Sequence, residues 1–330
     1  MLTRLIVRGL TVVGVLVAVA AAVPTVARVL EPHVGTPAPQ LAAFAPWALP
    51  GWLLAGALLL VGRPLRARGA IVLVVGVMVV VGVRWQVPPS SARHAAQDDP
   101  AGGVRVRVMT VNVMIGQGDA GRVFALVRQH QVDVLVVEEL TPAFAARLRA
   151  AGIDAVLSHP DLHPHARAAG TGIWSRWPLT PHGTIPSAGF EMPTVTVTPP
   201  GLPGGVSVTG IHTRPPVTDA GHVRWWRRDL AGLAAAARAR PDGPQIWTGD
   251  FNASRDHSGF RRILDTGLVD AGDAVSVASW PGFTWPAGHP VTRIDHVLVT
   301  PASVRVRRVV VVTVGGTDHH GVMADLVVQK

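Results

Sequence analysis

The hydrophobic pattern of the chain changes near residue 103. Before residue 86, apolar residues form three long runs at 9–27, 41–62 and 69–85, each bordered by charged residues. After residue 103, the apolar runs are short, and some alternate strictly with polar residues. Long apolar runs are typical of membrane-spanning helices and short ones of strands, so we expect a membrane region, 1–85, and a folded region, 104–330.

The first two runs are long enough for a membrane-spanning helix, which needs about 20 residues, with a range of roughly 17 to 25. The third has only 15 residues without a charge, Gly69–Val83, and it spans only if a flanking arginine extends to the interface. We expect all three runs to span. For the first run, a cleaved signal peptide is the alternative, because Arg4 and Arg8 precede it and small residues lie at 20–22.

The arginines predict the orientation of these helices. The N-terminal tail and the second loop together carry five arginines, whereas the opposite side carries three. Cytoplasmic loops are the richer in arginine, so we expect the N-terminus in the cytoplasm. Three spans then place the folded region outside the cytoplasm. If the third run does not span, the folded region lies in the cytoplasm.

Residues 86–103 are rich in Pro, Ser, Ala and charges without a period, which predicts a linker. Fully extended, this linker reaches roughly 60 Å, so the folded region stays near the bilayer. In the folded region, about nine runs predict strands and four stretches predict helices, one of them (219–240) amphipathic, which indicates a mixed α/β or α+β sandwich. The expected strands are 104–114, 132–138, 172–175, 193–198, 206–212, 245–248, 293–299, 304–314 and 322–328, and the expected helices are 119–131, 141–150, 219–240 and 257–266.

The composition excludes several kinds of chemistry. The chain has no Cys and no Tyr, and Lys330 is its only lysine, so thiol nucleophiles, Cys-ligated zinc and a catalytic lysine or tyrosine are excluded. The formal net charge is +9, but the first 94 residues hold eight arginines and a single acid. The folded region is therefore close to neutral, which does not favour a nucleic-acid partner.

Polar residues that can bind a metal or transfer a proton occur at the ends of six predicted strands. Strand ends present side chains from a rigid scaffold, so these residues are the candidates for catalysis. They are Asn112, Glu138, Glu139, His212, Asp250, Asn252, Asp295, His296, Asp318, His319 and His320.

The segments TVNV, VVEEL, GIHT, WTGDFNAS, RIDHVLVT and TDHHGVMADL, in this order, resemble the endonuclease/exonuclease/phosphatase superfamily. The resemblance covers about Val104–Val328, and the whole chain looks like a membrane-anchored bacterial member. It implies a four-layer sandwich of two packed mixed β-sheets flanked by helices. It also implies hydrolysis of phosphate esters with a divalent metal, Mg²⁺ or Mn²⁺.

For the metal, the resemblance implies Glu139 as a ligand, with Asn112 in support and Asp318 facing the metal or the phosphate. Mg²⁺ prefers carboxylate oxygens and water, which agrees with such a set. The family often has Gln at the position before this glutamate, where the chain has Glu138. Whether Glu138 shares the metal therefore stays open.

For proton transfer, the resemblance implies that His319 is the general base and that Asp295 orients it. The resemblance also implies that Asp250 orients or deprotonates the attacking water, or assists the leaving group. The implied phosphate contacts are Asn252, His212 and Asn112.

Three further features have alternative interpretations. His159, His163 and His165 have the spacing of metal ligands, but the prolines among them favour an exposed loop. Arg176 matches a family position near the phosphate, or it is solvated. The segment 225–228 (WWRR) either meets lipid headgroups or packs one Trp inward with its arginines in water.

These observations predict a membrane-anchored phosphoesterase with its catalytic domain outside the cytoplasm. A domain tethered beside the lipid bilayer has ready access to lipid phosphates, so lipid or prenyl (di)phosphates are the expected substrates. An extracytoplasmic metal-dependent nuclease is the first alternative. The second is a non-catalytic binding module, against which the complete set of strand-end residues argues. The oligomeric state is left open.

Overall fold

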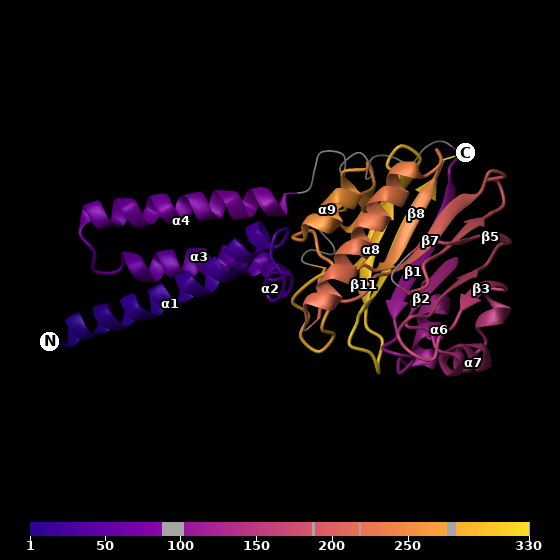
Figure 1. The fold of residues 1–330 in the computed structure, drawn as a ribbon, viewed down its shortest axis with the longest axis horizontal. Coiled ribbons are helices and arrows are strands. Elements are labelled where there is room, and N and C mark those ends of the chain that lie inside the picture. Colours follow the sequence, from indigo (N-terminus) through magenta and orange to yellow (C-terminus); the bar gives the residue numbers. More distant parts are fainter. Residues whose placement is uncertain (88–101, 187–188, 218, 276–281, 330) are drawn as a thin grey trace. The chain divides into compact units, whose positions relative to one another are not determined.

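The computed structural model describes residues 1–87, 102–186, 189–217, 219–275 and 282–329, and the chain divides into two compact units (Figure 1). The first unit comprises Met1–Val87 together with Pro216–Val223 and Arg255–Ser258, and the second holds the other described residues. The predicted linker, 86–103, lies mostly outside the described residues.

The first unit contains four helices: α1 (Leu2–Leu30), α2 (Ala38–Ala42), α3 (Ala45–Leu60) and α4 (Leu65–Gln86). Among the described residues, two helical segments are long and apolar enough to cross a membrane, Leu2–Leu30 and Ala67–Gln86. The second expected span is divided between α2 and α3, because a proline in the first turn of α3 starts a new helix there. With 16 residues, α3 is about 24 Å long, shorter than the roughly 30 Å hydrocarbon core.

Glycines mediate the packing of these helices. A Cβ at Gly14 of α1 would lie 2.9 Å from Leu59 of α3, and one at Gly56 of α3 would lie 3.0 Å from Val75 of α4. The opposite faces expose large apolar side chains, including Leu16 and Leu73. Close contacts at small residues together with apolar outer faces are typical of helices packed within a membrane.

In the described residues, the second unit is built on two six-stranded sheets, in which only the β1–β2 and β7–β8 pairs are parallel. The strand order of the first sheet is β11 (Val304–Val312), β12 (Gly321–Val328), β1 (Val104–Asn112), β2 (Val134–Glu138), β4 (Thr171–Ser175) and β3 (His159–His163). The order of the second is β5 (Leu179–Thr184), β6 (Pro193–Val197), β7 (Val206–His212), β8 (Gln245–Asp250), β10 (Asp295–Val299) and β9 (Val269–Asp270).

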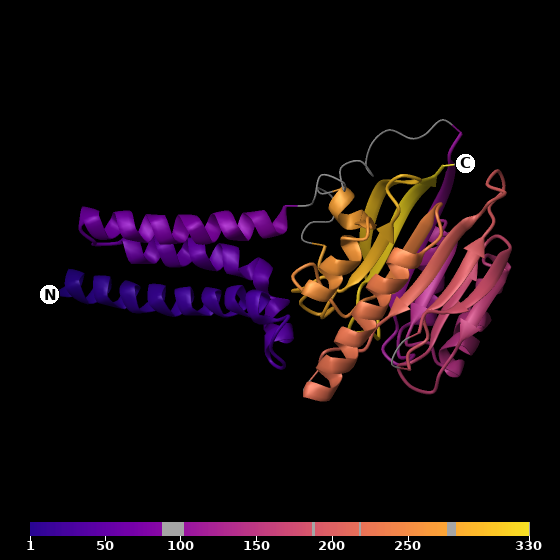
Figure 2. The same cartoon turned by 45° about the horizontal axis from the view of Figure 1, so that its top comes forward.

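The two sheets pack face to face, and helices cover their outer faces (Figure 2). Val, Ile and Leu side chains from both sheets fill the space between them. The helices α6 (Ala120–Gln129) and α7 (Pro142–Ala150) pack on the first sheet, and α8 (Ala220–Ala239) and α9 (Ser258–Leu264) pack on the second. The short helices η1 (Ile153–Ala155) and α10 (Ala271–Ala274) complete the unit. The expected four-layer sandwich is confirmed.

Local sequence signals account for several boundaries. The Asp119 carboxylate accepts a hydrogen bond from Arg122 N at the start of α6, and Thr141 Oγ1 accepts one from Phe144 N at the start of α7. The prediction of an exposed loop at His159–His165 is wrong for 159–163, which form β3. This strand lies at the edge of its sheet, where a proline is tolerated because one side of the strand needs no ladder hydrogen bonds.

Candidate active site

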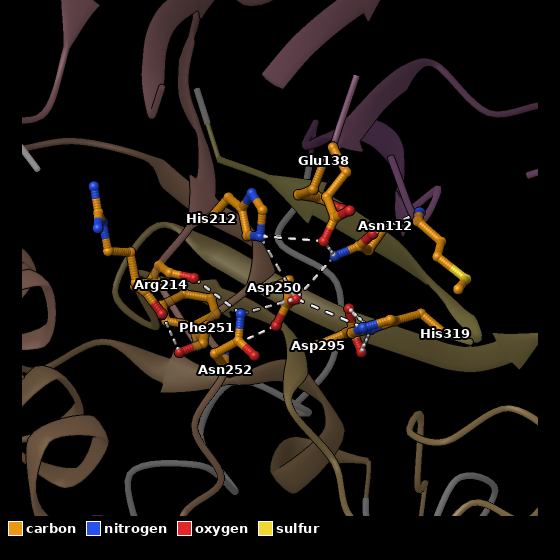
Figure 3. A network of polar contacts seen from close by, with 12 residues as sticks. Asn112, Glu138, His212, Arg214, Asp250, Phe251, Asn252, Asp295 and His319 are labelled. Atoms are coloured by element: carbon orange, nitrogen blue, oxygen red, sulfur yellow. Dashed lines mark hydrogen bonds and ion pairs between the residues drawn. The ribbon is translucent and has the colours of Figure 1, made fainter. Parts of the chain in front are cut away.

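Strand pairing brings the polar strand ends to one edge of the sandwich. Asn112 is paired with Glu138 across β1 and β2, while Asp250 lies opposite both His212 and Asp295 in the second sheet. His319 is in the loop that leads into β12, the neighbour of β1. Residues more than 200 positions apart in the sequence thus meet in one cluster (Figure 3).

His319 and Asp295 form the buried pair that the sequence predicted. His319 Nδ1 lies 3.0 and 3.1 Å from the two carboxylate oxygens of Asp295, and Nε2 lies 3.8 Å from Asp250 Oδ2. Because Asp295 holds a proton on Nδ1, the Nε2 atom is directed at the centre of the cluster. The geometry suits proton transfer at Nε2.

The charges around His319 change the protonation of the site. Burial acts to lower the pKa of His319, but the carboxylates of Asp295 and Asp250 outweigh it and raise this pKa to about 10. Burial raises the pKa of Asp250 to about 7 despite the opposing charge of His319. Burial, and then the charge of His319, lower the pKa of His212 to about 3, so His212 is neutral near pH 7.

Asn112 holds two carboxylates together. Its Nδ2 donates to Glu139 Oε1 at 3.1 Å and to Asp250 Oδ2 at 3.0 Å, and its Oδ1 accepts from Met114 N at 2.9 Å. Glu139 Oε2 accepts a further hydrogen bond from Ile115 N at 2.6 Å. The structure therefore places Asn112 and Glu139 together, as expected, and makes Asn112 the residue that spaces the acidic groups.

Glu138, the residue before Glu139, is fully buried. Thr110 Oγ1 donates to its Oε1 at 2.6 Å, and its Oε2 has no hydrogen-bond partner among the described residues. Burial, aided by the charges of Asp295 and Asp250, raises the pKa of Glu138 well above its usual value, so the neutral acid is favoured. The sequence analysis missed Thr110, although it lies two positions before Asn112 and so shares its strand face.

The Asn252 loop is fixed by a set of hydrogen bonds. Asn252 N donates to Asp250 Oδ1 at 2.7 Å, and Asn252 Nδ2 donates to Thr213 O at 2.9 Å. The buried Trp226 of α8 donates from Nε1 to Asn252 O at 3.0 Å, a contact that sequence alone did not indicate. Both Asn252 (φ 45°) and Glu139 (φ 55°) have left-handed backbones, which cost free energy in residues other than glycine.

A second buried chain of polar contacts supports this loop from below. His296 Nδ1 lies 2.7 Å from Asp270 Oδ2, and His296 Nε2 lies 3.0 Å from Ala253 O. Arg293 Nη2 lies 3.1 Å from the same Asp270 oxygen. Burial acts to raise the pKa of Asp270, but Arg293 and His296 outweigh it and hold this pKa well below its usual range. These polar contacts connect β9, β10 and the loop after β8.

The carboxylates of this cluster fit a hard divalent cation. Ligand atoms of Asp250, Asp295 and His319 lie within 4.8 Å of one another. Asp318 lies at the solvent-exposed side of the cluster, with 45% of its side chain exposed and its Oδ1 4.0 Å from His319 Nε2. Trp285 Nε1 donates a hydrogen bond to Asp318 Oδ2 at 3.1 Å. Carboxylate oxygens beside an opening to water are what Mg²⁺ and similar cations prefer.

The three features with alternative interpretations are also resolved. Arg176 follows β4 and forms an ion pair with Asp133 at 2.8 Å. Asp133 precedes the first residue of β2, whereas Glu138 is its last residue, so Arg176 lies at the other end of the strand from the cluster. The histidines of β3 are not part of a metal-like cluster among the described residues. In the segment 225–228, Trp226 packs inward while Trp225 is 43% exposed.

A buried His–Asp pair and several carboxylates at one edge of two packed sheets are characteristic of metal-dependent phosphoesterases. A family model for the Endonuclease/Exonuclease/phosphatase family matches residues 109–319, and the chain belongs to this family. Members of the family hydrolyse phosphodiester or phosphate ester bonds, and the chain is a hydrolase of that type.

Solved structures share the fold. The endonuclease/exonuclease/phosphatase from Beutenbergia cavernae DSM 12333 is 22% identical with a TM-score of 0.52, covering 68% of this chain and 72% of that one. D. rerio TDP2 complexed with a single-strand DNA product is 15% identical with a TM-score of 0.52, covering 67% and 98%. An AP endonuclease from Archaeoglobus fulgidus is 14% identical with a TM-score of 0.52, covering 66% and 98%. A search of the curated proteins found no match.

Proposed function

We propose that the protein is a membrane-anchored, Mg²⁺-dependent phosphoesterase that hydrolyses lipid or prenyl phosphate esters at the outer face of the membrane. The observation that carries the hydrolytic part of this proposal is the convergence of His319, Asp295 and Asp250 beside Asn112 and Glu139. The apolar helices of the first unit support the lipid part, because they keep the catalytic domain beside its substrate.

Three helices are proposed to span the membrane. The helices α1 and α4 have the length, and α3 packs against both of them through glycines and carries no charged residue. A helix as short as α3 spans if the bilayer thins locally, at a modest cost for each ångström of mismatch. Three spans and the arginine bias together place the catalytic domain outside the cytoplasm.

Glu139, with Asn112 and Asp318 beside it, is proposed to hold the cation. When bound, a divalent cation neutralises charge on the phosphoryl oxygens and lowers the pKa of water. Asn112 keeps the carboxylates of Glu139 and Asp250 spaced for this role. His212, neutral and fully buried, and Asn252 are proposed to donate hydrogen bonds to the phosphoryl oxygens.

His319 is proposed to take the proton of the attacking water at Nε2, while Asp295 fixes the ring and stabilises the imidazolium that forms. The carboxylates that raise the pKa of His319 keep it protonated near pH 7, so it would act as the base once the positive charge of a bound cation lowers that pKa. Asp250 is proposed to orient the water or to assist the leaving oxygen.

The test uses the full chain in neutral detergent micelles. Prenyl diphosphate, phospholipid, single- and double-stranded DNA and bis(4-nitrophenyl) phosphate are each assayed with Mg²⁺ and with chelator, beside the matched variant His319→Ala. Mg²⁺-dependent turnover of a lipid substrate that His319→Ala abolishes is the expected result. Turnover of DNA alone would replace the proposal with the nuclease alternative, and no turnover of any ester would leave a binding module.

A further inference from the structure

An arginine–aromatic rim extends from His212 to the surface of the catalytic domain. We define this rim by four residues, Phe190, Arg214, Trp225 and Arg228. The Phe190 ring packs on the His212 ring at a centroid distance of 4.6 Å. The Arg214 guanidinium carbon lies over two aromatic rings, 5.5 Å from the Phe190 centroid and 5.7 Å from the Trp225 centroid. Arg228 lies 5.7 Å from the same Trp225 ring.

The backbone holds this rim in place. Arg214 N donates to Asp229 Oδ2 at 3.2 Å, and Asp229 is a buried residue of α8, the helix that carries Trp225 and Arg228. Gly189 has a left-handed backbone, and a Cβ there would lie 3.3 Å from Arg214 Nη2. Figure 3 shows the Arg214 side chain extending away from Asp250 and Asn252. Arg214 therefore lies outside the reacting centre but is continuous with it through Phe190 and His212.

Stacking on aromatic rings uses the faces of a guanidinium, and its N–H donors lie in the plane, where they match a phosphate in a bidentate manner. The exposed Trp225 keeps two cations on one face of a domain that is otherwise close to neutral. The rim is thus complementary to an anionic group of the substrate that lies at a distance from the phosphate that is cleaved.

We infer that the rim binds a second phosphate group of the substrate. This second phosphate is carried by the alcohol that stays attached to the scissile phosphate after hydrolysis. This inference rests on the proposed function, and it narrows the substrate class to phosphate esters that carry two separated phosphate groups. Such a group is found in phosphorylated lipid headgroups and in nucleotides, which present the same chemistry to Arg214.

Matched substrate pairs test this inference with the full chain in micelles. The lipid pair is phosphatidylinositol and phosphatidylinositol 4-phosphate, and the nucleotide pair is thymidine 5′-(4-nitrophenyl phosphate) with and without a 3′-phosphate. The wild type should prefer the member with the second phosphate in at least one pair. Arg214→Gln should remove that preference through a KM roughly 10- to 100-fold higher, with kcat and the single-phosphate member little changed. Arg214→Lys should restore it only in part, because lysine lacks the planar fork.

Arg128→Gln is the matched control, since Arg128 is also an exposed arginine over an aromatic ring, 5.9 Å from the Phe124 centroid on α6. It should change neither member of a pair. The pair that shows the preference identifies the source of the second phosphate. An unchanged preference in Arg214→Gln, or an equal loss on both members, would overturn the inference.

Binding separates this inference from the proposed function. Titration calorimetry compares thymidine 3′,5′-bisphosphate with thymidine 5′-phosphate, and it requires no turnover. If the wild type binds the bisphosphate more tightly than the monophosphate, and Arg214→Gln abolishes this difference, the inference about the rim is supported even when no ester is hydrolysed. Equal binding of the two nucleotides, together with no preference within the lipid pair, counts against the rim even if esters are hydrolysed in a metal-dependent way.

Discussion

The two adjacent glutamates of the site differ in what each side chain reaches. Glu139 meets Asn112 and the backbone at Ile115 and is 17% exposed at its side chain, whereas Glu138 is buried against Thr110. A carboxylate with access to water can bind a cation, while a buried neutral acid cannot do so without losing a proton. The left-handed backbone at Glu139 turns the chain so that the two side chains separate in this way.

Glu139→Gln should therefore raise the concentration of Mg²⁺ needed for half-maximal activity and lower turnover, because it removes a charged ligand. Glu138→Gln should be mild, because an amide resembles the neutral acid that burial favours there. Titration of activity with Mg²⁺ in both variants measures the difference. A larger effect from Glu138→Gln would move the metal role to that residue.

His319 and Asp295 are expected to act as one unit. His319→Ala should lower kcat by about 10² to 10⁴-fold with little change in substrate binding, since general-base catalysis typically contributes that range. Asp295→Asn should also lower kcat, through a misoriented ring. The double variant should be little slower than His319→Ala, because both changes affect one proton transfer.

The rates of these three variants at saturating Mg²⁺ give this comparison, with circular dichroism as the control for folding. Near-normal activity in His319→Ala would assign the base to Asp250, whose pKa of about 7 suits that task.

At the scale of elements, the central strands were predictable and the edges were not. Strict alternation and apolar content identified β1, β7 and β12 almost to their boundaries, because a buried strand has few alternatives. β3 and β5 contain prolines and exposed residues, which edge strands tolerate, so their pattern resembles a loop. The strand-end residues were predictable as a set. Their contacts with Thr110 and Trp226 depend on pairing and packing that no local pattern encodes.

The chain of contacts through Asp270 connects three elements beneath the site, and its strength depends on pH. The folded-state pKa of Asp270 is depressed, so its contribution to stability is complete at neutral pH and declines once pH falls below the usual aspartate value of about 3.9. Asp270→Asn should lower the free energy of unfolding by about 3 kcal/mol at pH 7, because it leaves His296 buried without its acid and removes one of the two carboxylates that pair with Arg293.

Thermal unfolding in micelles at pH 7 and near pH 3 measures this change. The difference in unfolding temperature between the wild type and Asp270→Asn should be smaller at the lower pH. Asp154→Asn is the control, because Asp154 pairs with Arg149 at the surface, 3.7 Å away, with half of its side chain exposed. An equal loss of stability in Asp270→Asn and Asp154→Asn would contradict the role of Asp270 in these buried contacts.

At the scale of the whole molecule, the number of spanning helices decides where the reaction takes place. Two spans return the catalytic domain to the side of the N-terminus, and three place it on the opposite side. A reporter that is active only after export, fused after Lys330, should be active if α3 spans. A matched fusion to a reporter that is active only in the cytoplasm should then be silent, and the reverse pattern would remove the outer-face substrates from consideration.

The position of β12 also has a consequence for biosynthesis. This last strand of the chain lies between β11 and β1, and Val328 is paired with Val104 at the beginning of the domain. The first sheet therefore cannot close until the ribosome has synthesised β12, which follows β1 by most of the length of the domain. A protein-conducting channel accepts unfolded chains, so under the proposed topology this late closure keeps the domain competent for translocation until β12 is made.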